Sequence, residues 1–428
     1  MNEELSVFGR QLAGRGGIVE LMEDLGGALM KGGEDLCMLG GGQPAHIPEM
    51  GETWRRRLHE ILGEPGVMEK MLGNYDPPRG HAAFVDSLAR LMRRTFGWDI
   101  GPENIAVTAG GQTAFFMLFN ALGGMFPDGS SRRILLPLVP EYIGYADQSV
   151  GGRLFEGRRP RIDEGEDHEF KYHVDFDQLE IGDHVAALCA SRPTNPTGNV
   201  LTDDEVRRLA EIARARGIPL IIDNAYGAPF PNIIFREVTP VWDENIILTL
   251  SLSKLGLPGT RTGIVIARPE IVSAISSMTS VVGLANGNVG QAIIQPLMEN
   301  GEILRLSNEV VRPFYLKKLE FARSCLGGAF GEDFPWRVHR SEGALFLWLW
   351  FPDLPISSRE LYERLKQRGV LVVPGNYFFY GLDEADDSWR HRDECIRVTY
   401  TMDEGTVERG LRIIGEEVRR AWMRAQKE

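Results

Sequence analysis

Two hydroxyls and one amine follow directly after an apolar run, in Ser251-Leu252-Ser253-Lys254, and Arg261 comes seven residues after the lysine. The run itself, residues 246–250, predicts a buried parallel strand. In an open α/β sheet, ligands bind at the carboxyl ends of the strands. Burial there would lower the pKa of Lys254 and make its amine a nucleophile. Taken alone, Lys254 is better explained as a solvated loop lysine, so the other strand ends must decide.

Several other predicted strands also end in polar or glycine-rich residues. Gly110-Gly111-Gln112 follows the strand at 104–108 and opens a helix, whose free amides suit a phosphate. Asp223 ends the strand at 219–222 and could keep a ring nitrogen protonated. Asn195 and Tyr226 could donate to a ring oxygen, and Tyr142 could stack on a ring. A turn, an N-cap or ordinary packing explains each of these residues equally well by itself.

Two further features suit a substrate carboxylate. Arg397 is isolated in an apolar strand predicted at 395–400, where its guanidinium could form a fork for a carboxylate if it faces a cleft. Gly40-Gly41-Gly42 precedes a proline and would let backbone amides approach a ligand closely. A solvent-facing arginine and a plain surface turn are the alternatives.

The elements that position these residues alternate between helix and strand from about residue 81, which predicts a doubly wound, mostly parallel sheet. Thr202 to Glu205 is a capping box. The last third predicts an α+β unit with a long helix at 303–326. We expect an N-terminal arm with a helix at 18–30 (residues 1–48), a large domain (49–311) and a C-terminal small domain (312–428), the arm contributing to the small domain. Strands are expected at 104–108, 134–138, 185–190, 219–222, 246–250, 344–351, 370–373 and 395–400.

Composition excludes several classes of protein. The formal net charge of -13 disfavours a nucleic-acid partner. The four cysteines contain no C-x-x-C pair, so neither a disulfide framework nor a metal site is expected. The first residues, 1–5, are acidic and lack the apolar run of a signal peptide, and no apolar run is long enough to span a membrane. We therefore expect a cytoplasmic protein.

The order of the motifs resembles that of the pyridoxal-phosphate-dependent aminotransferases of fold type I, over essentially the whole chain. The resemblance implies pyridoxal 5'-phosphate as the cofactor, amino acids and 2-oxo acids as substrates, and a homodimer with shared active sites. On matching positions it implies that Lys254 forms the Schiff base and that Asp223 pairs with the pyridine nitrogen. Asn195 and Tyr226 would contact the ring hydroxyl, and Tyr142 would stack on the ring.

The resemblance also implies the residues around the phosphate and the substrate. Gly42, Asn195 and Arg397 would bind the substrate carboxylate. Two positions depart from the common pattern, because Arg261 follows the lysine one residue early and Gly111 stands where many relatives have serine. The phosphate would be bound by Gly110, Gly111, Gln112, Ser251, Ser253, Arg261 and the neighbouring subunit's copy of Tyr75.

Further stretches resemble one subgroup, the aminotransferases that act on valine and pyruvate. This implies a ping-pong exchange that converts L-valine and pyruvate into 3-methyl-2-oxobutanoate and L-alanine. Other neutral amino acids such as alanine or 2-aminobutyrate are alternatives, and a lyase or synthase is a less favoured one. A transcription regulator would need a basic DNA-binding module, and the residues before Gly40 are too few and not basic. A catalytically inactive binding protein is disfavoured because every catalytic position is filled. The stretches are 21–25, 40–50, 74–76, 141–147, 223–227 and 253–259.

Overall fold

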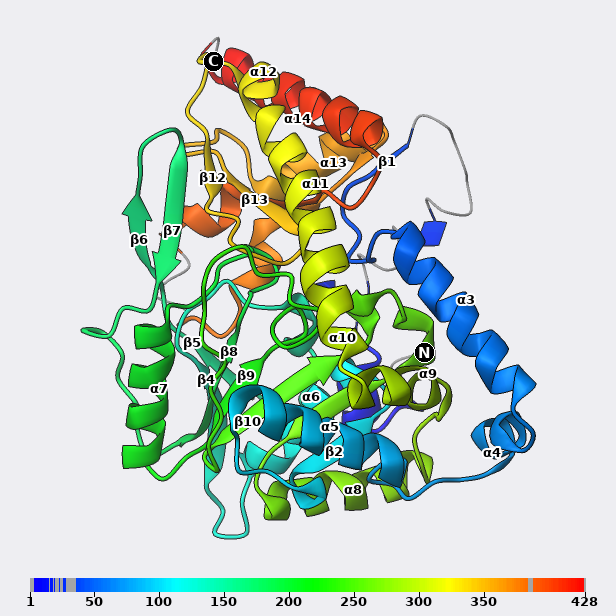
Figure 1. The fold of residues 1–428 in the computed structure, drawn as a ribbon. Helices are drawn as coiled ribbons and strands as arrows, with labels where there is room; N and C mark the ends of the chain where they lie inside the picture. Colours follow the sequence, from blue (N-terminus) through cyan, green and yellow to red (C-terminus); the bar gives the residue numbers. More distant parts are fainter. Residues whose placement is uncertain are drawn as a thin grey trace.

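The computed structural model describes residues 4–14, 36–383 and 388–426, together with residues 16, 17, 19, 23, 26 and 27. Most of the helix expected at 18–30, and most of the motif at 21–25, lie outside the described residues. Within them the chain forms an eight-stranded sheet, a six-stranded sheet and a two-stranded pair (Figure 1).

The eight-stranded sheet carries most of the predicted strand ends. Its strands β10, β9, β8, β4 and β5 pair in parallel with one another, whereas β11 runs antiparallel to both β10 and β2, and β3 runs antiparallel to β4. The predicted doubly wound, mostly parallel sheet is therefore confirmed. In order across the sheet the strands are β2 (Ile105–Thr108), β11 (Gly263–Ile266), β10 (Ile246–Ser251), β9 (Leu220–Asp223), β8 (Val185–Ser191), β4 (Ser131–Leu136) and β3 (Gly124–Met125), with β5 (Phe155–Gly157) beside β4.

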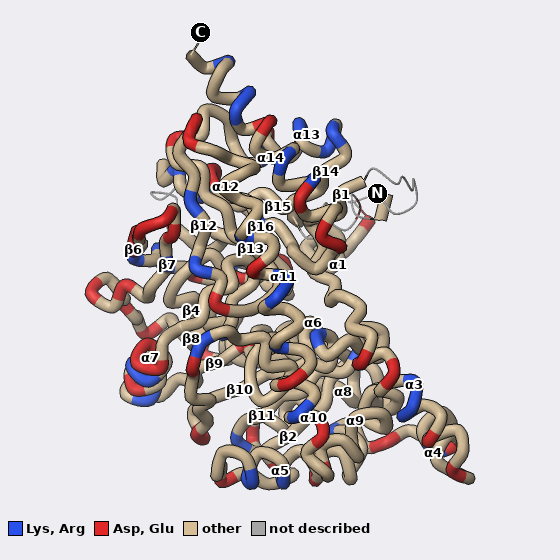
Figure 2. The backbone as a smooth tube through the Cα atoms, turned by 45° about the horizontal axis from the view of Figure 1, so that its top comes forward, with Lys and Arg blue, Asp and Glu red and all other residues tan. Residues whose placement is uncertain are grey.

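Helices pack around this sheet, because its central strands are buried on both faces and need apolar cover (Figure 1). The capping box is confirmed, since Thr202 accepts from the Glu205 N–H and the Glu205 side chain accepts from the Thr202 N–H. Acidic and basic residues alternate with apolar ones along α7 (Figure 2), whose buried residues include Val206, Leu209 and Ala213. The helices are α5 (Ala82–Phe96), α6 (Gly111–Leu122), α7 (Asp203–Ala215), α8 (Pro269–Gly283) and α9 (Val289–Glu299).

The six-stranded sheet combines the C-terminal third with a hairpin from the middle of the chain. The hairpin strands β6 (Arg161–Glu164) and β7 (Glu169–His173) join through a parallel pairing of β7 with β12. The sequence placed residues 161–173 in the large domain and did not anticipate this pairing. The other strands are β12 (Arg337–His339), β13 (Phe346–Trp350), β16 (Cys395–Thr399) and β15 (Val373–Pro374).

Strand β1 (Cys37–Met38) of the N-terminal arm pairs in parallel with β14 (Val370–Leu371) of the C-terminal third. The helices here are α12 (Leu326–Phe330), α13 (Ser358–Gln367) and α14 (Glu404–Ala425). A continuous helical stretch connects the two large sheets: α10 (Glu302–Arg305), a π-helical segment (Leu306–Val311) and α11 (Arg312–Ser324) (Figure 1). The chain also forms helices α1 (Val7–Leu12), α3 (Pro48–Gly63) and α4 (Val67–Gly73). None of the described helices combines the length and apolarity that a membrane crossing needs.

Candidate functional site

A cavity of about 960 Å³ opens where the carboxyl ends of β8, β9 and β10 meet β16 and the glycine-rich segment before α3. Parallel strands finish at the same edge of the sheet, so the polar residues that follow them lie close together. The predicted site residues that line it are Gly42, Gly111, Gln112, Tyr142, Asn195, Asp223, Tyr226, Ser251, Ser253, Lys254, Arg261 and Arg397.

Lys254 lies in the short turn after β10, with its side chain pointing into this cavity. Its Nζ donates a hydrogen bond to the Gly42 carbonyl at 2.6 Å and lies 5.3 Å from the centre of the Tyr226 ring. Burial, together with the positive charge of Arg397, lowers the pKa of Lys254 to about 8, while Asp223 opposes the shift. Roughly a tenth of the amine is therefore neutral and nucleophilic at pH 7, far more than for an ordinary lysine.

Asp223 is the last residue of β9 and is held by donors from three elements. Its carboxylate accepts hydrogen bonds from the Tyr145 hydroxyl, from the Ala225 N–H at 2.9 Å and from Thr249 Oγ1 at 3.4 Å. Burial raises the pKa of Asp223, whereas these three bonds lower it. A buried carboxylate of this kind needs a cationic partner, and a protonated ring nitrogen would supply one.

The N-terminus of α6 forms an anion cradle together with Arg261. Gly110 caps the helix with φ 96°, a conformation that favours glycine, and a Cβ atom here would lie 2.3 Å from Arg261 Nη2. The first N–H groups of a helix lack intrahelical acceptors. Ser251 and Ser253 line the same end of the cavity. Helix amides, hydroxyls and a guanidinium thus converge as a phosphate requires.

Arg397 projects from β16 toward the large sheet. Its Nη1 donates to Asn195 Oδ1 at 2.7 Å and its Nη2 donates to the Gly40 carbonyl at 2.6 Å. Its Nε is buried with no acceptor among the described residues. Burial lowers the pKa of Arg397 to about 10, so the guanidinium stays charged at neutral pH. The unpaired donor and the charge both suit a carboxylate ligand.

The remaining predicted residues divide into two groups. Tyr142 and Tyr226 line the cavity, and the Tyr226 hydroxyl is hydrogen-bonded to Asn195. Tyr75 lies outside it in the loop before α5 and is 84% exposed. The individual roles assigned to these residues remain predictions.

The sequence analysis gave no role to four residues that surround Asp223 or Tyr142. Tyr145 and Thr249 donate to Asp223, and Glu141 binds Ser191, which is paired with Asp223 in the sheet. Ser191 and Thr249 lie near the ends of β8 and β10, which was the available signal for them, whereas Glu141 and Tyr145 lie in the segment after β4. The direction of each side chain, however, depends on register and loop path, which the sequence alone does not specify.

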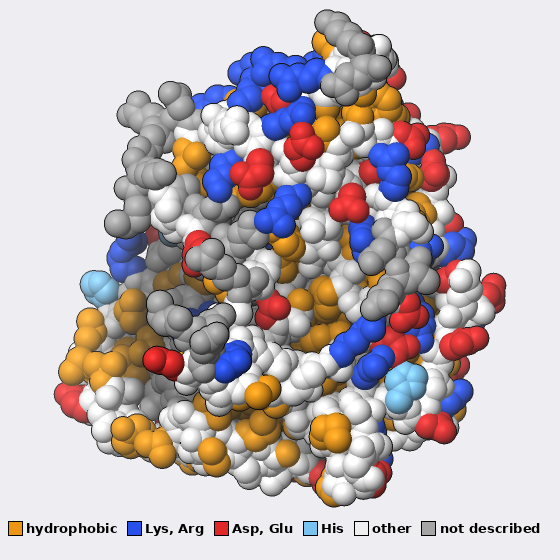
Figure 3. All heavy atoms as spheres, turned by 180° about the vertical axis from the view of Figure 1, so that it is seen from behind, with side chains coloured by type: hydrophobic (Ala, Val, Ile, Leu, Met, Phe, Trp, Pro, Cys, Tyr) orange, Lys and Arg blue, Asp and Glu red, His pale blue; other side chains and the backbone are white. Residues whose placement is uncertain are grey.

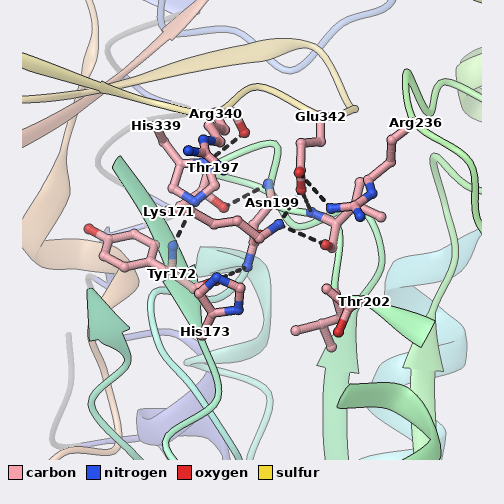
Figure 4. Close-up of polar contacts among 12 residues, drawn as sticks. Lys171, Tyr172, His173, Thr197, Asn199, Thr202, Arg236, His339, Arg340 and Glu342 are labelled. Atoms are coloured by element: carbon pink, nitrogen blue, oxygen red, sulfur yellow. Dashed lines mark hydrogen bonds and ion pairs between the residues drawn. The ribbon is translucent and has the colours of Figure 1, made fainter. Parts of the chain in front are cut away.

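A buried polar cluster supports the segment that carries Asn195 (Figure 4). Lys171 of β7 donates to Asn199 Oδ1 and to the Val200 carbonyl, each at 3.0 Å, and pairs with Glu342. Glu342 also accepts from Arg236 Nη1 at 2.7 Å. The hairpin that joins the six-stranded sheet therefore helps to position a cavity residue of the other sheet.

Comparisons with known proteins agree with this geometry. The family model described as aminotransferase class I and II matches residues 53–414. The valine–pyruvate aminotransferase of Escherichia coli is 47% identical over 417 residues, covering 97% of this chain and 98% of that protein.

Solved structures show the same relationship. The crystal structure of a putative amino-acid aminotransferase from Psychrobacter arcticum is 47% identical, with a TM-score of 0.94, and covers 98% of this chain and 99% of that one. The valine–pyruvate aminotransferase from Salmonella typhimurium is also 47% identical, with a TM-score of 0.87 over 95% of this chain and 100% of that one. Aspartate aminotransferase from Thermus thermophilus, at 21% identity and a TM-score of 0.77, shares the fold over 96% of this chain and 99% of that one.

Proposed function

We propose, since the chain belongs to the class I and II aminotransferases, that it binds pyridoxal 5'-phosphate and exchanges amino groups between L-valine and pyruvate. The observation that carries the proposal is the meeting of Lys254, Asp223 and Arg397 in one cavity. The cofactor would supply an aldehyde that condenses with amines and a ring that withdraws electrons from the substrate α-carbon.

The residues of the chain would act around that group in distinct ways. Lys254 carries the amine that holds the cofactor covalently and, once released, moves a proton to or from the substrate α-carbon. Asp223 keeps the ring nitrogen protonated through its buried negative charge. Arg397 binds the substrate carboxylate and so orients the α-carbon toward Lys254.

The charges around the cavity support a small apolar substrate side chain. Among the described residues that line it, the lysine and arginine side chains are Lys254, Arg261 and Arg397, which already have roles. Asp403 also lines the cavity, and hydrogen bonds from Thr406 lower the pKa of its carboxyl. A second carboxylate, as in glutamate or aspartate, would meet this negative charge without a free cation. Valine and alanine carry no such group.

The direct test is an absorbance titration of the purified protein with bound pyridoxal phosphate. L-valine should bleach the visible band of the cofactor and pyruvate should restore it, because each half-reaction changes the cofactor between its aldehyde and amine forms. Lys254→Ala should lose the band that depends on its amine. A band that responds to another amino acid but not to valine would retain the aminotransferase and reject valine as the donor. Ammonia release without exchange between oxo acids would instead indicate a lyase.

We also infer that the enzyme is a homodimer with shared sites. Large apolar side chains are exposed on α3 and α4, where Leu62 is 65% and Leu72 is 66% exposed, and Figure 3 shows hydrophobic side chains gathered on that side. Tyr75 lies in the adjoining loop, which Asn288 holds by donating to the Asn74 carbonyl at 3.2 Å. An apolar surface beside a projecting tyrosine supports contact with a second copy, whose phosphate site Tyr75 would reach.

A further inference from the structure

A buried carboxylate lies close to Asp223 and has no part in the function proposed above. Glu141 follows β4 in the loop that leads to Tyr142, and it is 1% exposed. Its Oε1 accepts from the Ser191 N–H at 2.8 Å, and its Oε2 accepts from Ser191 Oγ at 2.7 Å and from the Tyr142 N–H at 3.0 Å. Three donors from two segments of the chain therefore meet on one side chain.

The two segments that Glu141 joins are those that border the predicted position of the cofactor ring. Ser191 ends β8 and is the register partner of Asp223 on β9. Tyr142 lines the cavity and begins the turn that contains Tyr145, whose hydroxyl donates to Asp223. The Glu141 N–H donates to the Phe378 carbonyl at 3.0 Å, which fixes the loop from its other side.

We propose that Glu141 is a positioning residue of the cofactor site, which holds Tyr142 and the end of β8 in place and adds a second negative charge near Asp223. The inference rests on the proposed function, because it concerns the site that would hold pyridoxal phosphate. Burying a carboxylate costs free energy that an apolar side chain would avoid. A ring that became cationic beside Asp223 would offset that cost, because Glu141 interacts electrostatically with Asp223 and would lie near the same positive charge.

The surroundings of Glu141 let its charge respond to pH. The groups that face it are Asp223 on β9, Cys189 on β8, Tyr145 in the adjacent turn and Tyr380. Burial, with a smaller contribution from the charge of Asp223, raises the pKa of Glu141 to about 7 against the bonds from Ser191 and Tyr142. Above that pH the carboxylate is ionised, and it then favours the protonated form of a nearby base.

The test compares the pH midpoint of the visible absorption of protein-bound pyridoxal phosphate in wild type and in Glu141→Gln. A nearby negative charge favours the protonated form of the bound cofactor, so its removal should lower the midpoint by about 0.5 pH unit or more. The visible circular dichroism should also change, because the amide cannot accept from all three donors and Tyr142 shifts. Glu156→Gln is the matched control, since Glu156 on β5 is a buried carboxylate whose partners are Arg133, Arg158 and His184 rather than Ser191 or Tyr142.

An unchanged midpoint together with unchanged circular dichroism in Glu141→Gln, or equal changes in Glu156→Gln, would overturn the inference. If Glu141→Gln does not fold, Ser191→Ala takes its place. This variant keeps the Glu141 carboxylate but removes one donor that stabilises its ionised form. The pH midpoint should therefore fall, by less than the fall expected for Glu141→Gln. An unchanged midpoint in Ser191→Ala would overturn the inference. A wild-type protein without a visible band would instead refute the proposed function, which separates the two failures.

Discussion

Lys254 combines an ordinary side chain with an environment that changes its protonation. Because burial lowers its pKa to about 8, the fraction of neutral amine rises as the pH increases through that value. Only the neutral amine attacks an aldehyde. We expect the rate at which the apoprotein captures pyridoxal phosphate to rise with pH, with a midpoint near 8, when followed by stopped-flow absorbance.

The same argument predicts how a neighbour affects that midpoint. The positive charge of Arg397 disfavours the ammonium form of Lys254. Arg397→Met should therefore move the midpoint for capture upward by about 0.5 pH unit or more. Arg207→Met, at an exposed position on α7, is the control and should leave it unchanged. A midpoint in Arg397→Met equal to that of wild type would show that the two charges do not interact.

At the residue scale, many of the residues that line the cavity were predictable from the sequence, whereas the residues that support them were not. Lys254, Asp223 and Asn195 were predictable because parallel strands bring their carboxyl ends to one edge, wherever the strands lie in the chain. Glu141 and Lys171 were not assigned roles, because their partners Ser191 and Glu342 are remote in sequence. A residue type at a strand end indicates that a group is available, whereas its hydrogen-bond partners follow from packing.

The elements show the same distinction between local and long-range information. Strands β2, β8, β9 and β10 begin and end within about two residues of the predicted positions, because apolar runs between turn signals are local features. The hairpin β6–β7 was not assigned to the second sheet, since β7 pairs with β12, where Val338 faces Glu169. No periodicity within either strand encodes that pairing. The helical pattern at 303–326 predicted the long connection but not its π-helical segment.

The contact between the hairpin and the Asn195 segment leads to a prediction about stability. Lys171 is 3% exposed, and removing its ammonium would leave Asn199 Oδ1 and the Val200 carbonyl without their donor. Unsatisfied buried groups cost about 1–3 kcal/mol each. Lys171→Met should lower the melting temperature of the holoenzyme by about 3 °C or more in a calorimetric scan. Lys317→Met, on the exposed side of α11, should change it little, and an equal effect of both variants would contradict the role of the cluster.

The whole molecule has one side that a single chain leaves apolar. Leu62 and Leu72 on α3 and α4 are exposed beside the Tyr75 loop, and exposed apolar patches of this kind mark interaction surfaces. The paired substitution Leu62→Asp with Leu72→Asp should convert a dimer of 47.8 kDa chains into monomers, as measured by analytical ultracentrifugation. In a dimer the two introduced carboxylates would be buried at the interface, which is unfavourable without residues of opposite charge beside them.

The same variant links the assembly to the site. If Tyr75 reaches the phosphate in the second copy, the monomer should release pyridoxal phosphate during dialysis, whereas the wild-type dimer retains it. Tyr75→Phe should remain dimeric but bind the cofactor several-fold more weakly, since only its hydroxyl is lost. Met125→Asp is the control, because Met125 is equally exposed but lies on β3 at the opposite edge of the large sheet from β2. A Leu62→Asp, Leu72→Asp protein that stays dimeric would place the interface elsewhere, and a monomer that retains the cofactor would show that each site is complete within one chain.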